Sequence, residues 1–543
     1  MEPVSQSPGG AEGSGRIVAR GRVLFLCGLL LICCTAAFVG VVPTRIFGHD
    51  NFFLLDNGWR VFCGQRPHVD YYSPWGPVTF LLVALGLAVS KASADAIGYA
   101  STSFALLVGL WAYGVGRNRL GSAARILFGL YLALLVTAPY PLGKYPLWTS
   151  HAMVYNRYGY ALLGLVLVEC MRRPEGRGED DGEFWGGIST GAALGLALFL
   201  KVSYFGVGVV IVGAALIVQG LNRRRLGGMA VSFGAVALAL LAYLKFDVAR
   251  IGQDLWMAAG ARSKAMSGSE LVSTLGTRVL PLGIVMALIL YGSSPQKQKG
   301  RWLAEHQLLV WGLLVFLADT ALLFSNMQAG GNPLLGAFGI VVASWMTVEL
   351  RRAVAVKSSA EMQRYTFVLL LCGVLFVPQL CSDLVGLGYG AIQKAHPWAE
   401  RSRVRFSVAR LRPMILYDGA RDVDANGGLY TGRINAGIEL LKRECGPGDR
   451  VLNLDMVNPF PYALGWRPPR GGMAAAAYNY LFSDELRPSD DAYFGDATVV
   501  MEPKVPALEP HYYEGYYRIY HPAMLERFRL AAESESWRLY KLK

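Results

Sequence analysis

Charged residues are scarce in this chain. Asp, Glu, Lys and Arg make up 17% of its 543 residues, whereas hydrophobic residues make up 53% and the mean hydropathy is positive. An ordinary soluble domain carries about 25% charged residues. The shortage of charge therefore excludes a soluble enzyme of ordinary composition and indicates a membrane protein.

Closely spaced cysteine pairs of the CxxC type are also missing from the sequence. None of the eight cysteines forms a CxxC motif, and most of them lie inside apolar runs, where a thiol behaves as a small hydrophobic group. A cysteine-bound metal site is therefore not expected. Cys63 and Cys445 fall well outside the apolar runs, and a disulfide between them stays open as an alternative.

The net charge of +13 comes without a basic amphipathic face, because the basic residues fall in short clusters between apolar runs. No nucleic acid partner is expected, and the partner that the composition indicates is the lipid bilayer. Residues 1–22, which begin with a stretch rich in Gly, Ser and Pro, are predicted to form a disordered cytoplasmic tail.

Apolar runs near 20 residues long, the length that crosses a bilayer, recur between residues 23 and 381. We predict a polytopic α-helical membrane domain of about 11–13 spans in this region. The twelve candidate spans are 23–43, 76–92, 96–115, 125–141, 156–171, 185–200, 203–220, 227–246, 279–293, 306–324, 333–350 and 365–381.

The basic clusters predict the orientation, since cytoplasmic loops are enriched in Lys and Arg. One cluster precedes the first apolar run, and the others lie at every second later boundary between apolar runs. They are found at residues 16–22, 172–173, 223–225, 297–301 and 351–352. Residues 44–75 and everything after 381 are then extracytoplasmic. Arg117, Arg119 and Arg125 break this alternation, so the number of spans between 76 and 171 stays open.

The last third of the chain has a different pattern. Beyond residue 382 the apolar runs shorten, and "CGPGDRVLNLD" links a helical pattern at 434–444 through a turn to a strand-like run. Further strands are predicted at 496–503 and 536–542, with a helix at about 522–534 between them. We expect residues 382–543 to form a small extracytoplasmic α/β domain, which either covers part of the first loop or binds a partner there.

The first loop, "HDNFFLLDNGWRVFCGQRPHVDYYSPWGP" at 49–77, is dense in polar and aromatic residues. An ionisable residue beside a membrane span costs free energy unless it is solvated, paired or functional. Asp50, Asp56 and Asp70 all fall in this loop. Their structural alternative is the capping of short surface helices, which applies most strongly to Asp56.

This loop resembles the membrane glycosyltransferases of the GT-C superfamily, nearest to the branch of protein O-mannosyltransferases and the lipid A aminoarabinose transferase. An acidic residue follows the first span, a surface helix then ends in G-x-x-P, and D-x-x-x-P-x-G-P leads into the second run. The matching residues are Asp50, Gly64, Pro67, Asp70, Pro74, Gly76 and Pro77. The resemblance is good over residues 20–220 and weaker beyond them.

The resemblance implies an inverting transfer of a hexosyl or pentosyl group from a polyprenyl-phosphate donor to a glycan, lipid or protein acceptor. The site would face the outer side of a membrane, which suggests a bacterial inner membrane and a role in the cell envelope. Many relatives carry Asp-Glu where this chain has Asp50-Asn51. A divalent cation is therefore left open as a cofactor, and no metal ligand is predicted.

In such a transfer one carboxylate takes the proton of the attacking hydroxyl and cationic groups stabilise the departing phosphate. We predict Asp50 as the base, because its spacing to Gly64 fits the family better than that of Asp56. Lys201 interrupts a long apolar run and is the sharpest phosphate candidate, with a snorkelling lysine as its alternative. The other predicted substrate-binding residues are Asp56, Arg60, Arg66, Asp70, Lys144, His151, Tyr155 and Arg157, and Arg262 and Lys264 are further phosphate candidates.

A transporter or flippase of a lipid-linked sugar is the competing hypothesis. Such proteins place charges near the bilayer midplane and often contain internal repeats. Here the charges gather near the outer surface and the two halves of the membrane region do not resemble each other. A polymerase or ligase of cell-envelope glycans stays open as a closer alternative.

Overall fold

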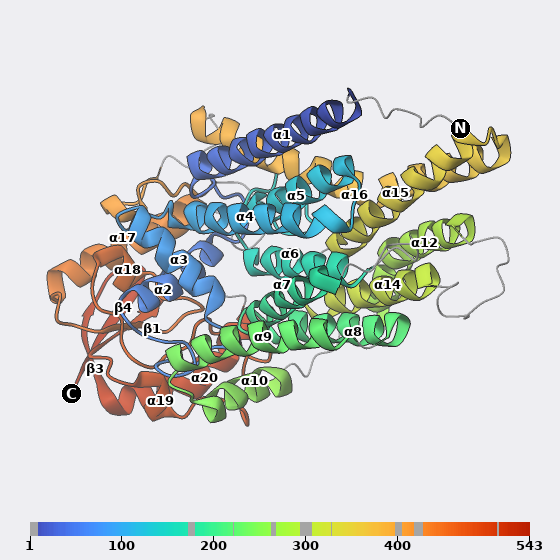
Figure 1. Cartoon of the computed structure of the whole chain (residues 1–543). Helices are drawn as coiled ribbons and strands as arrows, with labels where there is room; N and C mark the ends of the chain where they lie inside the picture. The colour runs from blue at the N-terminus through green and yellow to red at the C-terminus, as the bar shows by residue number, and fades with distance from the viewer. Residues whose placement is uncertain are drawn as a thin grey trace, which may run out of the picture.

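Helices dominate the structure, a computed structural model in which a long bundle carries a small sheet at one end (Figure 1). We call this end, where the C-terminal region also lies, the domain end, and the opposite end the far end. The residues that the structure describes are 9–171, 180–220, 222–261, 268–293, 307–326, 328, 330–396, 404–417, 427–507 and 510–543.

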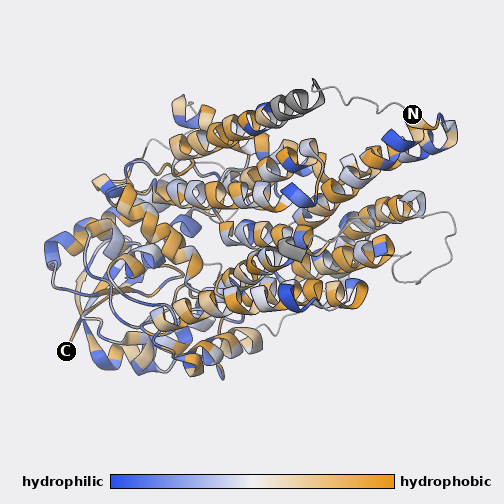
Figure 2. Cartoon of the chain, viewed as in Figure 1, coloured by the Kyte–Doolittle hydropathy of each residue, from blue (hydrophilic) through white to orange (hydrophobic). Residues whose placement is uncertain are grey.

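Each of the twelve predicted runs coincides with a helix, because a continuous apolar run can satisfy its backbone hydrogen bonds in lipid only as a helix. Among the described residues, eight helical stretches are long and apolar enough to cross a membrane, and Figure 2 shows that hydrophobic residues predominate along the helices of the bundle. The helices are α1 (Gly9–Val39), α3 (Val78–Val89), α4 (Ala96–Val115), α5 (Ser122–Thr137), α6 (Val154–Cys170), α7 (Asp180–Leu198), α8 (Val202–Gln219), α9 (Arg223–Tyr243), α12 (Leu280–Ser293), α14 (Gln307–Ser325), α15 (Pro333–Ala355) and α16 (Ser359–Ala395). The chain is a multi-pass integral membrane protein.

Helix α3 does not cross the bundle. Its 12 residues span about 18 Å, short of the roughly 30 Å of a hydrocarbon core. Both of its ends lie at the domain end: Val78 N donates to Phe199 O, and the turn after it accepts a hydrogen bond from Tyr462 OH at Ala92 O. One of the twelve candidate spans, 76–92, is therefore not a span, and this removes the conflict in the alternation of basic clusters.

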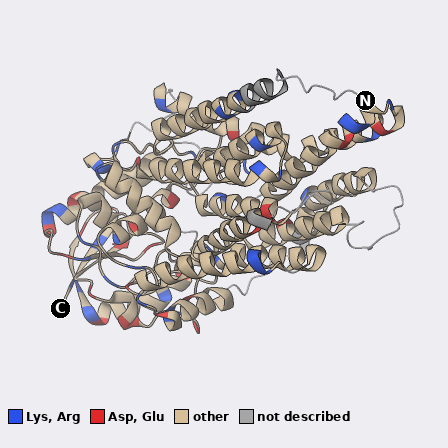
Figure 3. Ribbon diagram, viewed as in Figure 1, with Lys and Arg blue, Asp and Glu red and all other residues tan. Residues whose placement is uncertain are grey.

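The remaining helices run alternately between the two ends. The turn at 138–153 lies at the domain end, where Arg45 N donates to Thr149 O, and the turn before α5 lies at the far end, where Arg119 pairs with Glu169. Eleven of the twelve helices therefore run between the two ends in the described part, and a π-helical turn (Leu275–Val279) joins α11 (Gly268–Thr274) to α12. Figure 3 shows few charges along the helices and many around the sheet.

The C-terminal region contains a four-stranded sheet of order β1-β2-β4-β3, in which β1 runs parallel to β2 and the other pairs are antiparallel. The strands are β1 (Val451–Asn453), β2 (Val499–Pro503), β3 (Phe528–Glu533) and β4 (Trp537–Leu542). The helices are α17 (Gly427–Glu444), α18 (Phe460–Leu464), α19 (Asp490–Phe494) and α20 (Pro510–Arg527). This confirms the predicted small α/β domain.

One predicted helix boundary is wrong. The helix expected at 522–534 ends at Arg527, because residues 528–533 pair with β4 and sheet pairing overrides local helix propensity. Helix α16 continues past the predicted domain boundary at 382, and its end carries buried polar residues that interrupt its apolar pattern. Within the expected disordered tail 1–22, the helix begins at Gly9, since helix propagates readily from an apolar span.

Helix α2 (Gly48–Phe62) fills most of the first loop and is buried under the C-terminal region. Asn57 Nδ2 donates to Ala474 O, and Trp59 Nε1 donates to Trp466 O. Thr44 N, just before α2, donates to Ile415 O. The prediction that the C-terminal domain covers this loop is confirmed, and the ring of Trp59 is buried.

Candidate functional site

Two glycines of the first-loop motif shape the site. Gly64 has φ 89°, a left-handed conformation that ends α2 and turns the chain back. Gly76 lies directly against the break between α7 and α8, where a Cβ atom would come within 2.0 Å of Phe199 O. Only glycine permits this approach, which brings the loop against the residues that precede Lys201.

Asp50 lies in the first turn of α2 at the domain end. Its side chain keeps 16% of its surface exposed, and His49 Nε2 lies 3.7 Å from Asp50 Oδ1. The positive end of the helix dipole favours a carboxylate at this position. Asp50 is therefore held as a partly solvated carboxylate within a largely buried helix.

Lys201 sits at the N-terminus of α8 in an extended conformation, at the break from α7. Its ammonium donates to Asn156 Oδ1 at 3.3 Å and lies 5.2 Å from the centre of the Tyr155 ring. Phe53, one turn after Asp50 on the same face of α2, has its ring centre 6.2 Å from that of Tyr155. The structure thus brings the α2 turn that carries Asp50 together with Tyr155 and Lys201, although these residues are separated by up to 151 positions in the sequence.

Aromatic rings surround this group. The ring of Trp75 lies 5.7 Å from that of Tyr155 and 4.8 Å from that of Phe53, measured between ring centres. Tyr155 and Phe53 are themselves 6.2 Å apart. Such faces stack well on the apolar face of a sugar ring. We call Asp50, Tyr155, Lys201 and Trp75 the candidate site.

Asp56 and Arg60 lie elsewhere and are fully buried. Arg60 Nε donates to Asp56 Oδ2 at 3.2 Å, and Arg60 Nη1 donates to Pro469 O and Gly471 O. Burial raises the pKa of the Asp56 carboxyl, although the positive charge of Arg60 opposes this. In this structure both side chains fasten the loop to the C-terminal region, and no solvent-facing surface is left for a substrate.

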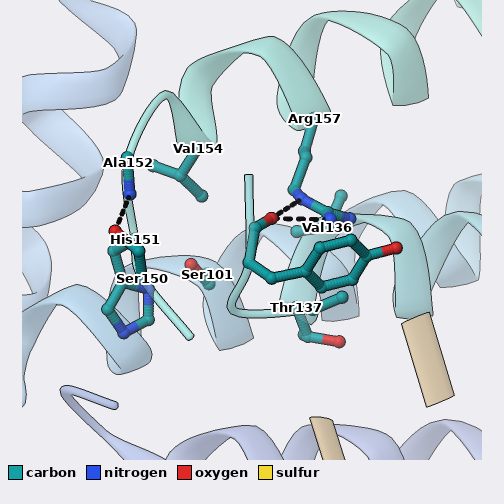
Figure 4. Close-up of a pocket in the computed structure, with 10 residues that line it drawn as sticks. Ser101, Val136, Thr137, Ser150, His151, Ala152, Val154 and Arg157 are labelled. Carbon is teal, nitrogen blue, oxygen red and sulfur yellow. Dashed lines mark hydrogen bonds between the residues drawn. The ribbon is translucent and has the colours of Figure 1, made fainter. Parts of the chain in front are cut away.

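Arg157 and His151 form a second buried group (Figure 4). Arg157 Nη1 donates to Asp383 Oδ1 at 2.9 Å, and its other donors go to Tyr140 O. His151 Nε2 accepts from Val42 N at 3.0 Å, and burial lowers the pKa of His151 to about 4. The pocket between them is too narrow to hold a water molecule. Neither residue is brought to Asp50.

The remaining predicted residues are spread over the domain end. Arg66 N donates to Asp70 Oδ2, which closes a turn after α2, and Asp70 Oδ1 lies 3.6 Å from Arg470 Nε. Lys144 is half-buried and lies over the ring of Trp148. Arg262 and Lys264 lie outside the described residues, as do the basic clusters at 172–173 and 297–301.

A divalent cation would need several oxygen ligands. Within the described ranges, no three His, Cys, Asp or Glu side chains come together as a metal-binding group. A divalent cation therefore stays a prediction, and the chemistry below uses the chain's own residues. Cys63 and Cys445, the candidates for a disulfide, are both free.

One contributor to the site carried no signal in the sequence. Asn156 positions Lys201 by accepting from its ammonium, whereas its neighbours Tyr155 and Arg157 were both among the predicted substrate-binding residues. An uncharged amide in a polar and aromatic segment gives no reason in the sequence to single it out.

Comparisons with solved structures gave the following matches. ArnT from Cupriavidus metallidurans in the apo state is 14% identical over 97% of this chain and 98% of that chain, with a TM-score of 0.40. The archaeal oligosaccharyltransferase AglB from Archaeoglobus fulgidus, in complex with an inhibitory peptide and a dolichol-phosphate, is 10% identical over 96% of this chain and 74% of that chain, with a TM-score of 0.40. Both are GT-C family members. No protein-family model and no curated protein matches the chain.

Proposed function

We propose that the protein is an inverting glycosyltransferase that moves a hexosyl or pentosyl group from a polyprenyl-phosphate donor to an acceptor at the domain end. The observation that carries this proposal is the placement of an ammonium, Lys201, over the ring of Tyr155, against which α2 packs one turn after its partly exposed carboxylate, Asp50. A transfer from a lipid phosphate needs one group of each charge, and the membrane-embedded bundle supplies access for the lipid.

The chain's own residues account for each step. Asp50 accepts the proton of the acceptor hydroxyl while its oxygen attacks the anomeric carbon. The bond from that carbon to the phosphate oxygen breaks, the lipid phosphate leaves as an anion, and the ammonium of Lys201 stabilises its charge. The new bond forms on the face opposite the leaving group, so the configuration inverts. Asp50 then returns its proton to water.

The side of the membrane follows from the same topology. With α3 excluded, Arg117, Arg119, Arg125 and the cluster Arg223–Arg225 fall at the far end together with Arg351 and Arg352. Cytoplasmic ends of spans are enriched in Lys and Arg. We therefore propose that the candidate site faces the outer side of a bacterial inner membrane.

Two substitutions test the chemistry. Asp50→Asn keeps the size of the side chain but removes the proton acceptor, so transfer should fall by roughly 10²–10⁴-fold while thermal stability stays near wild type. Asp56→Asn should lower stability instead, because Asp56 pairs with a buried arginine. Transfer assays with undecaprenyl-phosphate hexoses and pentoses would measure the first effect, and near-normal turnover by Asp50→Asn would contradict it.

Lys201→Gln tests the phosphate contact. Loss of a charge-assisted hydrogen bond costs about 1.5–3 kcal/mol, so affinity for undecaprenyl phosphate should fall roughly 10–100-fold. Lys91→Gln is the matched control, because Lys91 is an exposed lysine at the same end. If both variants bound undecaprenyl phosphate with equal affinity, Lys201 would be a snorkelling lysine and not a phosphate ligand. Binding without covalent transfer would favour the transporter.

A further inference from the structure

Helix α10 (Val248–Ala261) follows α9 at the domain end, at the edge of the bundle (Figure 1). One of its polar side chains, Asp254, is buried. Asp254 Oδ2 accepts from Ser73 N at 3.0 Å and lies 2.9 Å from His68 Nδ1. A carboxylate that is buried needs such donors, because they compensate for its lost hydration. Asp254 therefore ties α10 to the first loop across 181 positions of the sequence.

The part of the loop that Asp254 holds, residues 68–75, has a constrained backbone. His68 has φ 67°, a left-handed conformation that residues other than glycine seldom adopt, and its N–H donates to Tyr71 O at 3.0 Å. Such a conformation persists only where the surrounding structure holds it. Both groups that bond to Asp254 lie in this part of the loop, so the carboxylate supplies some of that support.

Ser73 links Asp254 to the candidate site. Its N–H donates to Asp254, while its hydroxyl donates to Trp75 O at 2.8 Å and accepts from Trp75 N at 3.2 Å. These bonds hold both backbone polar groups of Trp75, whose ring centre lies 5.7 Å from that of Tyr155. The ammonium of Lys201 lies 5.2 Å from the centre of the same Tyr155 ring. A continuous series of contacts therefore runs from α10 to the candidate site.

Arg250 makes a different contact between the same helix and the same loop. Its Nη1 atom donates to Val69 O at 2.7 Å, and the side chain is exposed. On the helix side, Arg250 Nε lies 3.5 Å from Asp247 Oδ2. Arg250 thus fastens α10 to the loop at the surface, whereas Asp254 bonds to the residue that holds Trp75. This difference allows attachment of the helix to be separated from a role in the site.

We propose that Asp254 is a positioning residue for the transfer reaction, which acts through Ser73 to hold the ring of Trp75 in place. This rests on the proposed function, in which the donor phosphate lies at Lys201 and its sugar lies beside the aromatic rings of the candidate site. Stacking on a sugar depends on the orientation of the ring. A misplacement of about 1 Å far from the reacting atoms can lower the rate by roughly 10²-fold.

Asp254→Ala tests this role, because it removes the acceptor for Ser73 N–H. The turnover of sugar transfer, kcat, should fall about 10–100-fold. Affinity for undecaprenyl phosphate, which contains the phosphate without the sugar, should stay at the wild-type value. Asp254→Asn keeps an oxygen that accepts from Ser73 N–H and should retain most of the turnover. Arg250→Met is the matched control, since it removes the contact with Val69 O and should leave kcat unchanged.

Ser73→Ala tests whether the effect passes through Ser73. It removes the hydroxyl that bonds to Trp75 and should itself lower kcat, so adding Asp254→Ala should cost much less than Asp254→Ala does alone. A normal kcat in either single variant, effects that multiply in the double variant, or an equal loss in Arg250→Met would overturn the positioning role. A wild-type protein that transfers none of the sugars would overturn the proposed function itself, so the two failures are distinguishable.

Discussion

Asp50 and Lys201 keep part of their surface exposed, whereas Asp56, Arg60, Arg157 and Asp383 are buried in ion pairs. A buried pair is strongly destabilised when one partner is removed, because the other charge is left without compensation. Charged residues near the domain end therefore divide into a structural group and a group open to substrate. The sequence shows the residue types but not this division, since Arg157 and Asp383 are 226 positions apart.

Arg157→Met tests the structural assignment. The substitution leaves Asp383 buried without its cation, so the free energy of unfolding should fall by about 3–5 kcal/mol. The double variant Arg157→Met, Asp383→Leu should recover part of this loss, because no unpaired charge remains. Thermal unfolding in detergent would measure both. A stable Arg157→Met with weakened lipid-phosphate binding would instead support the predicted substrate role.

His151 predicts a pH dependence of stability. Its pKa is about 4 in the folded protein against 6.5 for an ordinary histidine, so between these values the unfolded chain binds a proton that the folded protein does not. Stability from this residue is complete above pH 6.5 and should fall by roughly 2 kcal/mol by pH 5. His151→Gln keeps an acceptor for Val42 N–H and should lessen the fall. A variant with the wild-type pH profile would contradict this.

At the scale of elements, apolar periodicity predicted the helices of the bundle but not their relation to the membrane. The run at 76–92 is as apolar as a true span, and only its contacts with Phe199 and Tyr462 show that it returns to the same end. Helix α10 (Val248–Ala261) had no prediction of its own, because its apolar residues are interrupted by polar ones. The length of α3 and the packing of both helices determine these positions, and hydropathy does not predict packing.

Cysteine labelling tests the position of α3. Lys91 lies just after α3 and Lys442 lies in α17, and both are exposed at the domain end, whereas Asn118 is exposed at the far end. In a background without native cysteines, a membrane-impermeant maleimide should label Lys91→Cys and Lys442→Cys from the same side. Asn118→Cys should react only after the membrane is opened. Labelling of Lys91→Cys together with Asn118→Cys would show that α3 crosses.

At the scale of the whole molecule, the bundle and the C-terminal region behave as one body through α2. Asn57, Trp59 and Arg60 all donate to backbone carbonyls between residues 466 and 474. Sequence analysis anticipated that the C-terminal domain covers the loop, but it placed Arg60 among substrate-binding residues. The arginine that joins the two parts looks the same in sequence as one that binds a phosphate.

Arg60→Leu tests this coupling. It leaves Asp56 buried without its partner and removes the donors to Pro469 O and Gly471 O, so unfolding free energy should fall by about 3–5 kcal/mol. The C-terminal region should also become more sensitive to proteinase K than the bundle. Arg443→Leu, an exposed arginine of α17, is the control. If digestion of Arg60→Leu matched that of the wild type, the claim that Arg60 couples the C-terminal region to the bundle would be wrong.

The contacts of α2 also determine when the site can form during synthesis. Asn57 meets its partner Ala474 across 417 positions, and Arg60 meets Gly471 across 411. When the ribosome has made α2, its polar side chains have no final partners, and they obtain them only after the last span and the C-terminal region have been made. Contacts this distant in sequence form slowly, because the intervening chain must first be ordered. The loop that carries Asp50 therefore reaches its final contacts late, and a partly synthesised chain has every span before it has a complete site.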